Sequence, residues 1–239
     1  MSRPPRKSDF IRYRRTLFRL VEAQHRISTS RLTDSLIEEE RLEKLVEQVK
    51  PPLPKEARGL HYLLATPFRY GHRTASRFRR AGERPGIFYA SESRITCLTE
   101  LAYWRLRFHA ASPDARLPAS TTEHFMFSVP VDAGRALDLT APPFAVDHAK
   151  WTSKTSYEAC QGFATSARSI AAQLIRYESA RDPGGTNAAL LDAACFTAPV
   201  PTSEGSWHLR FQNGKLIARA AAPSDERHEF EFKEMGFER

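Results

Sequence analysis

The chain has 239 residues, of which 41% are apolar and 10% aromatic, so it can bury the core of one large domain, with or without an extension. No apolar run reaches the roughly 18–20 residues that span a bilayer, and the basic N-terminal residues lack the apolar stretch of a secretory signal. We therefore expect neither a membrane protein nor a secreted one. Cys97, Cys160 and Cys195 are far apart and form no CxxC motif, which argues against a disulfide framework or a zinc site and favours a cytoplasmic location.

The formal net charge is +8, and the excess is concentrated near the N-terminus. Residues 1–26 hold eight Arg or Lys against Asp9 and Glu22. This pattern is typical of a basic arm attached to an ordinary domain, and such arms often contact nucleic acid or another polyanion. Packing on the acidic segment 38–40 and contact with an acidic partner are the alternatives, and the sequence leaves them open.

Helices are predicted in the first fifty residues. The apolar positions between Phe10 and Gln24 are compatible with a short helix. A second helix is predicted at about 32–49, with N-caps offered by Ser28, Thr29 and Ser30, and it ends at the prolines that begin with Pro51. We interpret this region, roughly residues 10–50, as a helical N-terminal subdomain that packs on the rest of the chain.

Strands and helices are mixed from residue 60 onward. The elements predicted in the first part are strands at 60–65, 68–70 and 86–91, an Arg-rich loop at 71–85 and a helix at 93–109. The helix is indicated by a stripe of helical period formed by Cys97, Leu101, Trp104 and Phe108.

The second part is predicted to contain strands at 125–129, 136–139, 174–177 and 188–196, a helix at 156–173 and a loop at 178–187. A turn at Gly134 separates the first two of these strands. Asn213-Gly214 is the strongest hairpin signal in the chain and joins strands at 207–211 and 215–218. Because α and β elements mix without regular βαβ alternation, the expected fold class is α+β.

Three residues of the region 76–100 suit a substrate with phosphates, a flat ring and a developing positive charge. Arg77 offers the planar guanidinium that binds phosphate in a bidentate manner. Tyr89 offers a ring for stacking, and Glu100 a carboxylate at the edge of the buried face of its helix, able to stabilise a cationic transition state. Each also has an ordinary structural explanation, as a paired surface charge or a core tyrosine. Ser179, in a Gly-containing loop, is either a turn residue or a ribose or phosphate ligand.

No metal-binding, GxGxxG or GxxxxGK[ST] spacing occurs in the sequence, and no Gly-x-Ser-x-Gly surrounds Ser179. We therefore expect no metal site, no bound cofactor and no serine nucleophile.

The order and spacing of these residues resemble the RES domain family, which is named for an Arg, a Glu and a Ser. The matching segments are Arg77-Phe78 with Gly82, Tyr89, Glu100, Tyr177-Glu178-Ser179-Ala180-Arg181, Gly184 and Asn187. Thr66-Pro67-Phe68-Arg69-Tyr70 and segments of the first fifty residues resemble its longer members. The chain departs from the family pattern where Phe78-Arg79 replaces the frequent Trp-Asn. The added positive charge at Arg79 would favour phosphate as a nucleophile.

The resemblance implies a compact α+β fold similar to ADP-ribosyltransferases, with a basic helical extension over residues 1–58 and an NAD+-cleaving domain over 59–239, whose core is about 60–200. It implies NAD+ as substrate, cleaved at the nicotinamide–ribose bond by water or inorganic phosphate. Arg77, Glu100 and Ser179 would be catalytic; Arg69, Tyr70, Tyr89 and Asn187 would bind substrate.

The resemblance further implies the toxin of a toxin–antitoxin pair, neutralised by an Xre-type helix-turn-helix antitoxin. DNA contact would occur only through that antitoxin, and a homodimer is one arrangement of the complex. Two other hypotheses stay open: mono-ADP-ribosylation of a protein, and a nucleic-acid-binding module that uses the basic arm.

Overall fold

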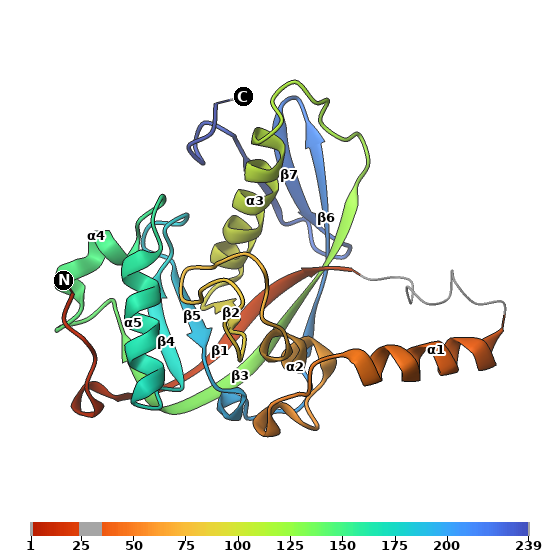
Figure 1. Ribbon diagram of the computed structural model, residues 1–239. Helices are drawn as coiled ribbons and strands as arrows, with labels where there is room; N and C mark the ends of the chain where they lie inside the picture. Colours follow the sequence, from red (N-terminus) through yellow and green to blue (C-terminus); the bar gives the residue numbers. More distant parts are fainter. Residues whose placement is uncertain (1, 24–34, 239) are drawn as a thin grey trace.

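The structure is a computed structural model, and it describes residues 2–23 and 35–238 (Figure 1). The helices are α1 (Leu36–Val49), α2 (Tyr62–Arg69), α3 (Arg94–Ala110), α4 (His148–Trp151) and α5 (Glu158–Ser169). The strands are β1 (Ile11–Glu22), β2 (Phe88–Ser91), β3 (Thr122–Asp138), β4 (Leu174–Glu178), β5 (Thr186–Leu190), β6 (Thr202–Gln212), β7 (Lys215–Ala220) and β8 (Arg227–Phe230). None of the described helices is long and apolar enough to cross a membrane.

The sheet has a closed part and an open part. Its eight strands follow the order β1-β2-β5-β4-β3-β6-β7-β8, and a further pairing of β1 with β3 closes the first five strands into a ring. Strand β3 makes this possible because it is long: it pairs with β1 along one edge, and with β6 and then β4 along the other. The β3–β4 pair is parallel and the other pairs are antiparallel. Strands β6 to β8 form a wing beside the ring.

Two helices cover the outside of the sheet and place the site between them. The buried face of α3, which includes Leu98 and Leu106, packs on the wing against Trp207 and its neighbours. Helix α5 buries Phe163 and nearby alanines against the outer face of β4 and β5. Figure 1 shows α3 rising beside β6 and β7, α5 lying along β4, and α1 projecting away from the body.

Residues 11–22 form strand β1, so the helix predicted at 10–24 is wrong. The buried positions Tyr13, Leu17 and Leu20 have spacings that a helix would also produce. The backbone instead pairs in register with β3, from Ile11 opposite Ala136 to Glu22 opposite His124. This long antiparallel ladder, with its cross-strand packing, outweighs the weak local propensity. The basic residues of this segment lie on the sheet; Arg12, for example, pairs with Asp132 of β3 rather than with α1.

The strands predicted at 60–65 and 68–70 are also wrong, because these residues form helix α2. Its buried residues Leu64, Ala65 and Phe68 have helical spacing and join the core inside the ring. The helix begins where the Nδ1 atom of His61 accepts a hydrogen bond from the Leu63 amide, at 3.3 Å. Pro67 lies within its last turn, and the helix ends two residues later.

Other predicted boundaries need smaller corrections. The two strands expected around Gly134 are one continuous strand, β3, and no turn occurs there. The strand expected at 188–196 ends at Leu190 and is followed by a short 3₁₀ helix at Ala193–Cys195. On α3, Trp104 and Phe108 are 47% and 72% exposed, so the buried stripe is rotated away from the predicted one.

The remaining elements agree with the sequence. The helices predicted at 93–109 and 156–173 correspond to α3 and α5, and the Asn213-Gly214 hairpin joins β6 and β7 as expected. Helix α1 begins at Ser35, whose hydroxyl accepts a hydrogen bond from the Glu38 amide. The N-caps predicted at residues 28–30 lie outside the described residues.

The packing of β1 leads to a stability prediction. Leu17 is completely buried among aromatic side chains of the ring, including Phe88 and Phe127. We expect Leu17→Ala to lower the free energy of unfolding by about 2–5 kcal/mol, measured by urea denaturation. The matched control, Leu36→Ala on the exposed face of α1, should change it by less than about 0.5 kcal/mol. Equal, small effects of both variants would mean that β1 is not part of the cooperative core.

Candidate functional site

Glu100, on α3, is the centre of the site. Its Oε1 atom accepts hydrogen bonds from Ser179 Oγ at 2.7 Å and from Asn187 Nδ2 at 2.8 Å. Asn187 is oriented in turn by Ser91, whose hydroxyl donates to the amide oxygen at 2.6 Å; Ser91 and Asn187 are directly opposed on β2 and β5. Among the described residues, Oε2 accepts no hydrogen bond, so the carboxylate is fixed through one oxygen and the other is available to a ligand.

The Ser179 hydroxyl is held by the turn that comes after β4. It accepts hydrogen bonds from the amides of Arg181 and Asp182, at 3.1 and 3.0 Å, so its proton is directed to Glu100. Asp182 accepts a hydrogen bond from Thr96 Oγ1 at 2.7 Å, which ties this turn to the first turn of α3. A Cβ atom at Gly185 would lie 2.3 Å from Asp182 Oδ2, so a larger residue there would displace the Asp182 carboxylate.

Tyr89 fastens the Arg77 loop to strand β2. Its hydroxyl lies 2.8 Å from Ser76 Oγ and accepts a hydrogen bond from the Phe78 amide at 3.1 Å. Burial raises the pKa of the Tyr89 phenol to about 12, so it stays neutral at physiological pH. In this neutral state the phenol orders the loop that carries Arg77.

Arg77 is held over an aromatic ring. Its Nη1 atom donates to the carbonyl oxygen of Trp151 at 2.6 Å, and its guanidinium carbon lies 5.0 Å from the centroid of the Tyr157 ring. Arg77 also lines the cavity that contains Glu100, so the structure brings these two predicted site residues to one cavity.

A cavity of about 250 Å³ connects these residues, and Arg77, Tyr89, Glu100 and Asn187 all line it. Its other polar or aromatic lining residues include Arg19, Ser76, Ser91, Trp104, Tyr157, Tyr177 and Arg181. Cys97 also lines it, but burial raises the pKa of this thiol to about 12, which makes it a poor nucleophile. No group of three metal-ligating side chains occurs in the part of the chain that the structure describes.

Arg69 and Tyr70 lie away from the cavity that contains Glu100, so the structure does not bring these two predicted substrate-binding residues together with the others. The Arg69 guanidinium donates to the Pro51 carbonyl at 2.6 Å and pairs with Glu47 of α1. Hydrogen bonds from Arg69 and Lys50 lower the pKa of the Glu47 carboxyl. Arg69 thus anchors α1 to α2, and neither Arg69 nor Tyr70 lines the cavity.

Reasoning from the sequence misses several lining residues. It assigns Arg19 to a basic arm, because nothing in the chain distinguishes this residue from the other arginines of residues 1–26. Tyr157 carries no local signal, and the helical period places Trp104 on the buried stripe of α3. Arg181 adjoins the Ser179 motif, and its guanidinium carbon lies 3.6 Å from the ring centroid of Tyr103. Proximity to that motif is the one available signal for Arg181.

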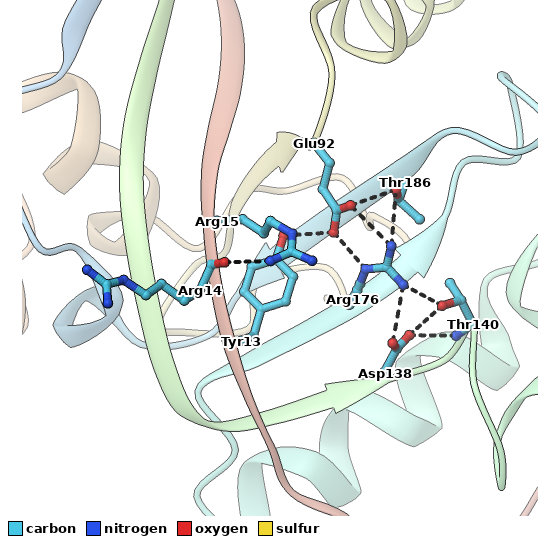
Figure 2. Close-up of polar contacts among 8 residues, drawn as sticks. All are labelled: Tyr13, Arg14, Arg15, Glu92, Asp138, Thr140, Arg176 and Thr186. Carbon is cyan, nitrogen blue, oxygen red and sulfur yellow. Dashed lines mark hydrogen bonds and ion pairs between the residues drawn. The ribbon is translucent and has the colours of Figure 1, made fainter.

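A charged network lies on the reverse face of the strands that carry the site (Figure 2). Arg176 donates from Nε to Glu92 Oε1 at 2.6 Å, and from Nη1 to Asp138 Oδ2 at 3.2 Å. Tyr13 and Thr186 also donate to Glu92, at 2.8 and 2.9 Å. The network therefore joins β1, β3, β4 and β5 to the end of β2.

Alternation along the strands links this network to the site. Three residues of the network are next in the chain to residues on the opposite face: Glu92 follows Ser91, Thr186 precedes Asn187, and Arg176 precedes Tyr177. Successive strand residues point to opposite faces. The hydrogen bonds of the network therefore also hold the strand register that places the site residues on the other face.

The comparisons with known proteins identify the family. The RES domain model matches residues 53–212, so the chain belongs to the RES domain family. Among solved structures it is similar to that of the M. tuberculosis MbcT–MbcA toxin–antitoxin complex, with 14% identity, a TM-score of 0.47 and coverage of 84% of this chain and 87% of that one. A comparison with curated proteins finds no match.

The ion pair between Glu92 and Arg176 leads to a prediction about the stability of the fold in acid. Burial opposes ionisation of Glu92, but hydrogen bonds from Arg176, Tyr13 and Thr186 outweigh it, and the pKa of the carboxyl lies below its usual 4.5. The ion pair therefore stabilises the fold above pH 4.5, and its contribution is lost as the pH falls through the lowered pKa. We expect Glu92→Gln to reduce the free energy of unfolding by about 2 kcal/mol at pH 7.

This difference should shrink when denaturation is repeated at successively lower pH below 4.5, as the carboxyl becomes protonated. Glu56→Gln, at an exposed position, is the matched control and should match wild type throughout. A difference between wild type and Glu92→Gln that is as large in acid as at neutral pH would contradict the assignment of the stabilisation to the Glu92 charge.

Proposed function

We propose that this protein cleaves NAD+ at the bond between nicotinamide and ribose. The observation that carries the proposal concerns Glu100, which lines the cavity. Ser179 and Asn187 hold its carboxylate by hydrogen bonds to Oε1. A carboxylate fixed in this way is suited to stabilising the positive charge that develops on the ribose as nicotinamide leaves. Membership of the RES domain family supports the assignment.

The reaction requires little covalent help from the protein. As the C–N glycosidic bond breaks, its electron pair moves to the pyridinium nitrogen, and nicotinamide leaves as a neutral ring. The ribose becomes oxocarbenium-like, and Glu100 stabilises this charge more strongly in the transition state than in the ground state. Water then bonds to the ribose carbon and releases a proton, giving ADP-ribose. Inorganic phosphate in place of water gives ADP-ribose-1″-phosphate.

The lining of the cavity suits the reacting half of the substrate. Tyr89, Tyr157 and Trp104 provide aromatic surfaces for a flat ring. Arg77 provides a guanidinium for a phosphate or for a ribose oxygen, in the same cavity. Ser179 acts on Glu100 rather than on the substrate, because its hydroxyl is fully occupied by the carboxylate and by two amides.

We further propose that the protein is the toxin of a toxin–antitoxin pair, and that an Xre-type helix-turn-helix antitoxin neutralises it. RES family membership supports this role, and depletion of NAD+ would account for growth arrest. Expression from an inducible promoter, with and without the adjacent helix-turn-helix reading frame, tests it. Arrest that the neighbouring protein relieves is the expected result; arrest that persists beside it, in cells with normal NAD+, would refute the pairing.

The first kinetic prediction concerns Glu100. We expect Glu100→Gln, which preserves shape but removes the charge, to lower kcat for NAD+ cleavage by about 100- to 1,000-fold, with little change in Tm. Release of nicotinamide by the purified protein, followed by chromatography, is the measurement. Glu158→Gln, at an exposed position of α5, is the matched control and should retain wild-type activity. Equal activity of Glu100→Gln and wild type would remove Glu100 from the reaction.

The second prediction concerns the products. Incubation with NAD+ in phosphate buffer and in a phosphate-free buffer, with mass spectrometry, separates ADP-ribose from its 1″-phosphate. We expect one of these products to form in an amount equal to the nicotinamide released. When radiolabelled NAD+ is used, we expect no label on protein. Label that accumulates on a protein band in place of free product would indicate mono-ADP-ribosylation instead.

A further inference from the structure

A second, larger cavity adjoins the one that contains Glu100. It has a volume of about 800 Å³, and Arg19, Ser76 and Tyr89 line both cavities. The smaller cavity, at about 250 Å³, lies below the roughly 300–1,000 Å³ typical of small-molecule sites. It can take the nicotinamide riboside part of a dinucleotide, but the rest of such a ligand has to extend beyond it. Arg19, Ser76 and Tyr89 mark where the two cavities meet, and the larger cavity is the neighbouring space into which such a ligand would extend.

Arg19 is held at this junction by a carbonyl and a ring rather than by an anion. Its Nη1 atom donates to the carbonyl oxygen of Tyr89 at 3.2 Å, and its guanidinium carbon lies 4.7 Å from the ring centroid of Phe88. Within residues 2–23 and 35–238, no carboxylate forms an ion pair with it. Removal from solvent lowers the pKa of its guanidinium to about 10, so the group is still charged at physiological pH. Arg19 is half-buried, and even a partly buried charge costs free energy unless an anion accompanies it.

A second guanidinium adds to the positive potential. Arg79 is 4% exposed and lines the larger cavity. It donates to the carbonyl oxygens of His72, Thr74 and Arg80, at 2.7–3.0 Å, and no carboxylate pairs with it in the described part of the chain. The pKa of the His72 imidazole, on the same wall, is lowered first by desolvation and then by the charges of Arg79 and Arg19.

We infer that the diphosphate of the dinucleotide binds at Arg19, in the junction between the cavities, and that its adenosine lies in the larger cavity. The inference rests on the proposed function, since it places the remainder of NAD+ once nicotinamide is at Glu100. Tyr62 and Phe125 line the larger cavity and offer aromatic surface for a base. Arg19 lies on β1, outside the residues that the family model matches, so it is a binding residue that the RES motif does not contain.

The test uses ADP, which carries the diphosphate and the adenosine but no nicotinamide. Binding is measured by isothermal titration calorimetry to wild type, Arg19→Met, Arg12→Met and Glu100→Gln. Methionine keeps the packing of the Arg19 stem on Phe88 and removes the charge. We expect Arg19→Met to weaken ADP binding by roughly 10- to 100-fold, as for the loss of a hydrogen bond to a charged group. Glu100→Gln should bind ADP as wild type does.

Arg12→Met is the matched control, because Arg12 lies on the same strand but is exposed and pairs with Asp132. It should leave ADP affinity unchanged. Wild-type ADP affinity in Arg19→Met, or an equal loss in Arg12→Met, would overturn the inference. Since an unpaired charge is removed, the Tm of Arg19→Met without ligand should be no lower than that of wild type. If Arg19→Met does not fold, Arg19→Lys serves instead, and its expected loss is smaller because lysine lacks the planar fork.

A kinetic measurement separates this inference from the proposed function. Nicotinamide riboside lacks both phosphates, so Arg19→Met should lower kcat/KM about 10- to 100-fold for NAD+ and less than about threefold for nicotinamide riboside. Equal losses for the two substrates would overturn the diphosphate assignment. If wild type and Arg12→Met bind ADP, Arg19→Met binds it more weakly, and wild type releases no nicotinamide from NAD+, the proposed function fails and the binding site stands.

Discussion

The contact between Arg176 and Glu92 is the constraint on which the site depends. It joins β4 to the end of β2 across β5, with Thr186 and Tyr13 bound to the same carboxylate (Figure 2). Side chains alternate along strands, so this network on one face sets where the site residues of β2, β4 and β5 lie on the other. Asn187 of β5 then donates to Glu100, which lies on α3, and the other hydrogen bond to this carboxylate comes from Ser179 in the turn after β4. The geometry of the site is thereby held by interactions on the face that the cavity does not reach.

Charges are paired differently in the Arg176 network and around the cavities. On the reverse face, the arginine is matched by Glu92 and Asp138. Around the cavities, Arg77 and Arg19 rely on backbone carbonyls and aromatic rings instead. Arginines placed in this way have ordered guanidinium groups whose charge no carboxylate of the described residues neutralises. The stability needed for this arrangement comes from the closed ring of strands and from the matched network behind it.

Reasoning from the sequence succeeds where the signal is local. The amphipathic pattern of α5 and the Asn213-Gly214 hairpin each depend on one short segment, and the family is recognised from several short motifs that follow one another in order along the chain. It fails at β1 and α2. The apolar spacing of residues 11–22 fits either element, and the choice is made by β3, more than a hundred residues away. The position of Arg69 away from the cavity could not be predicted for a similar reason, because its partner Glu47 lies on another helix.

The sequence by itself determined the family, the α+β class and the types of residue in the candidate site, since these depend on composition, periodicity and ordered motifs. The tertiary structure alone decided which arginines reach the cavity. Arg19 and Arg69 look alike in the chain, yet one lies at the junction of two cavities and the other pins α1 to α2. The physical reason is that a long side chain finds its partner through strand pairing and helix packing, which bring together residues distant in sequence.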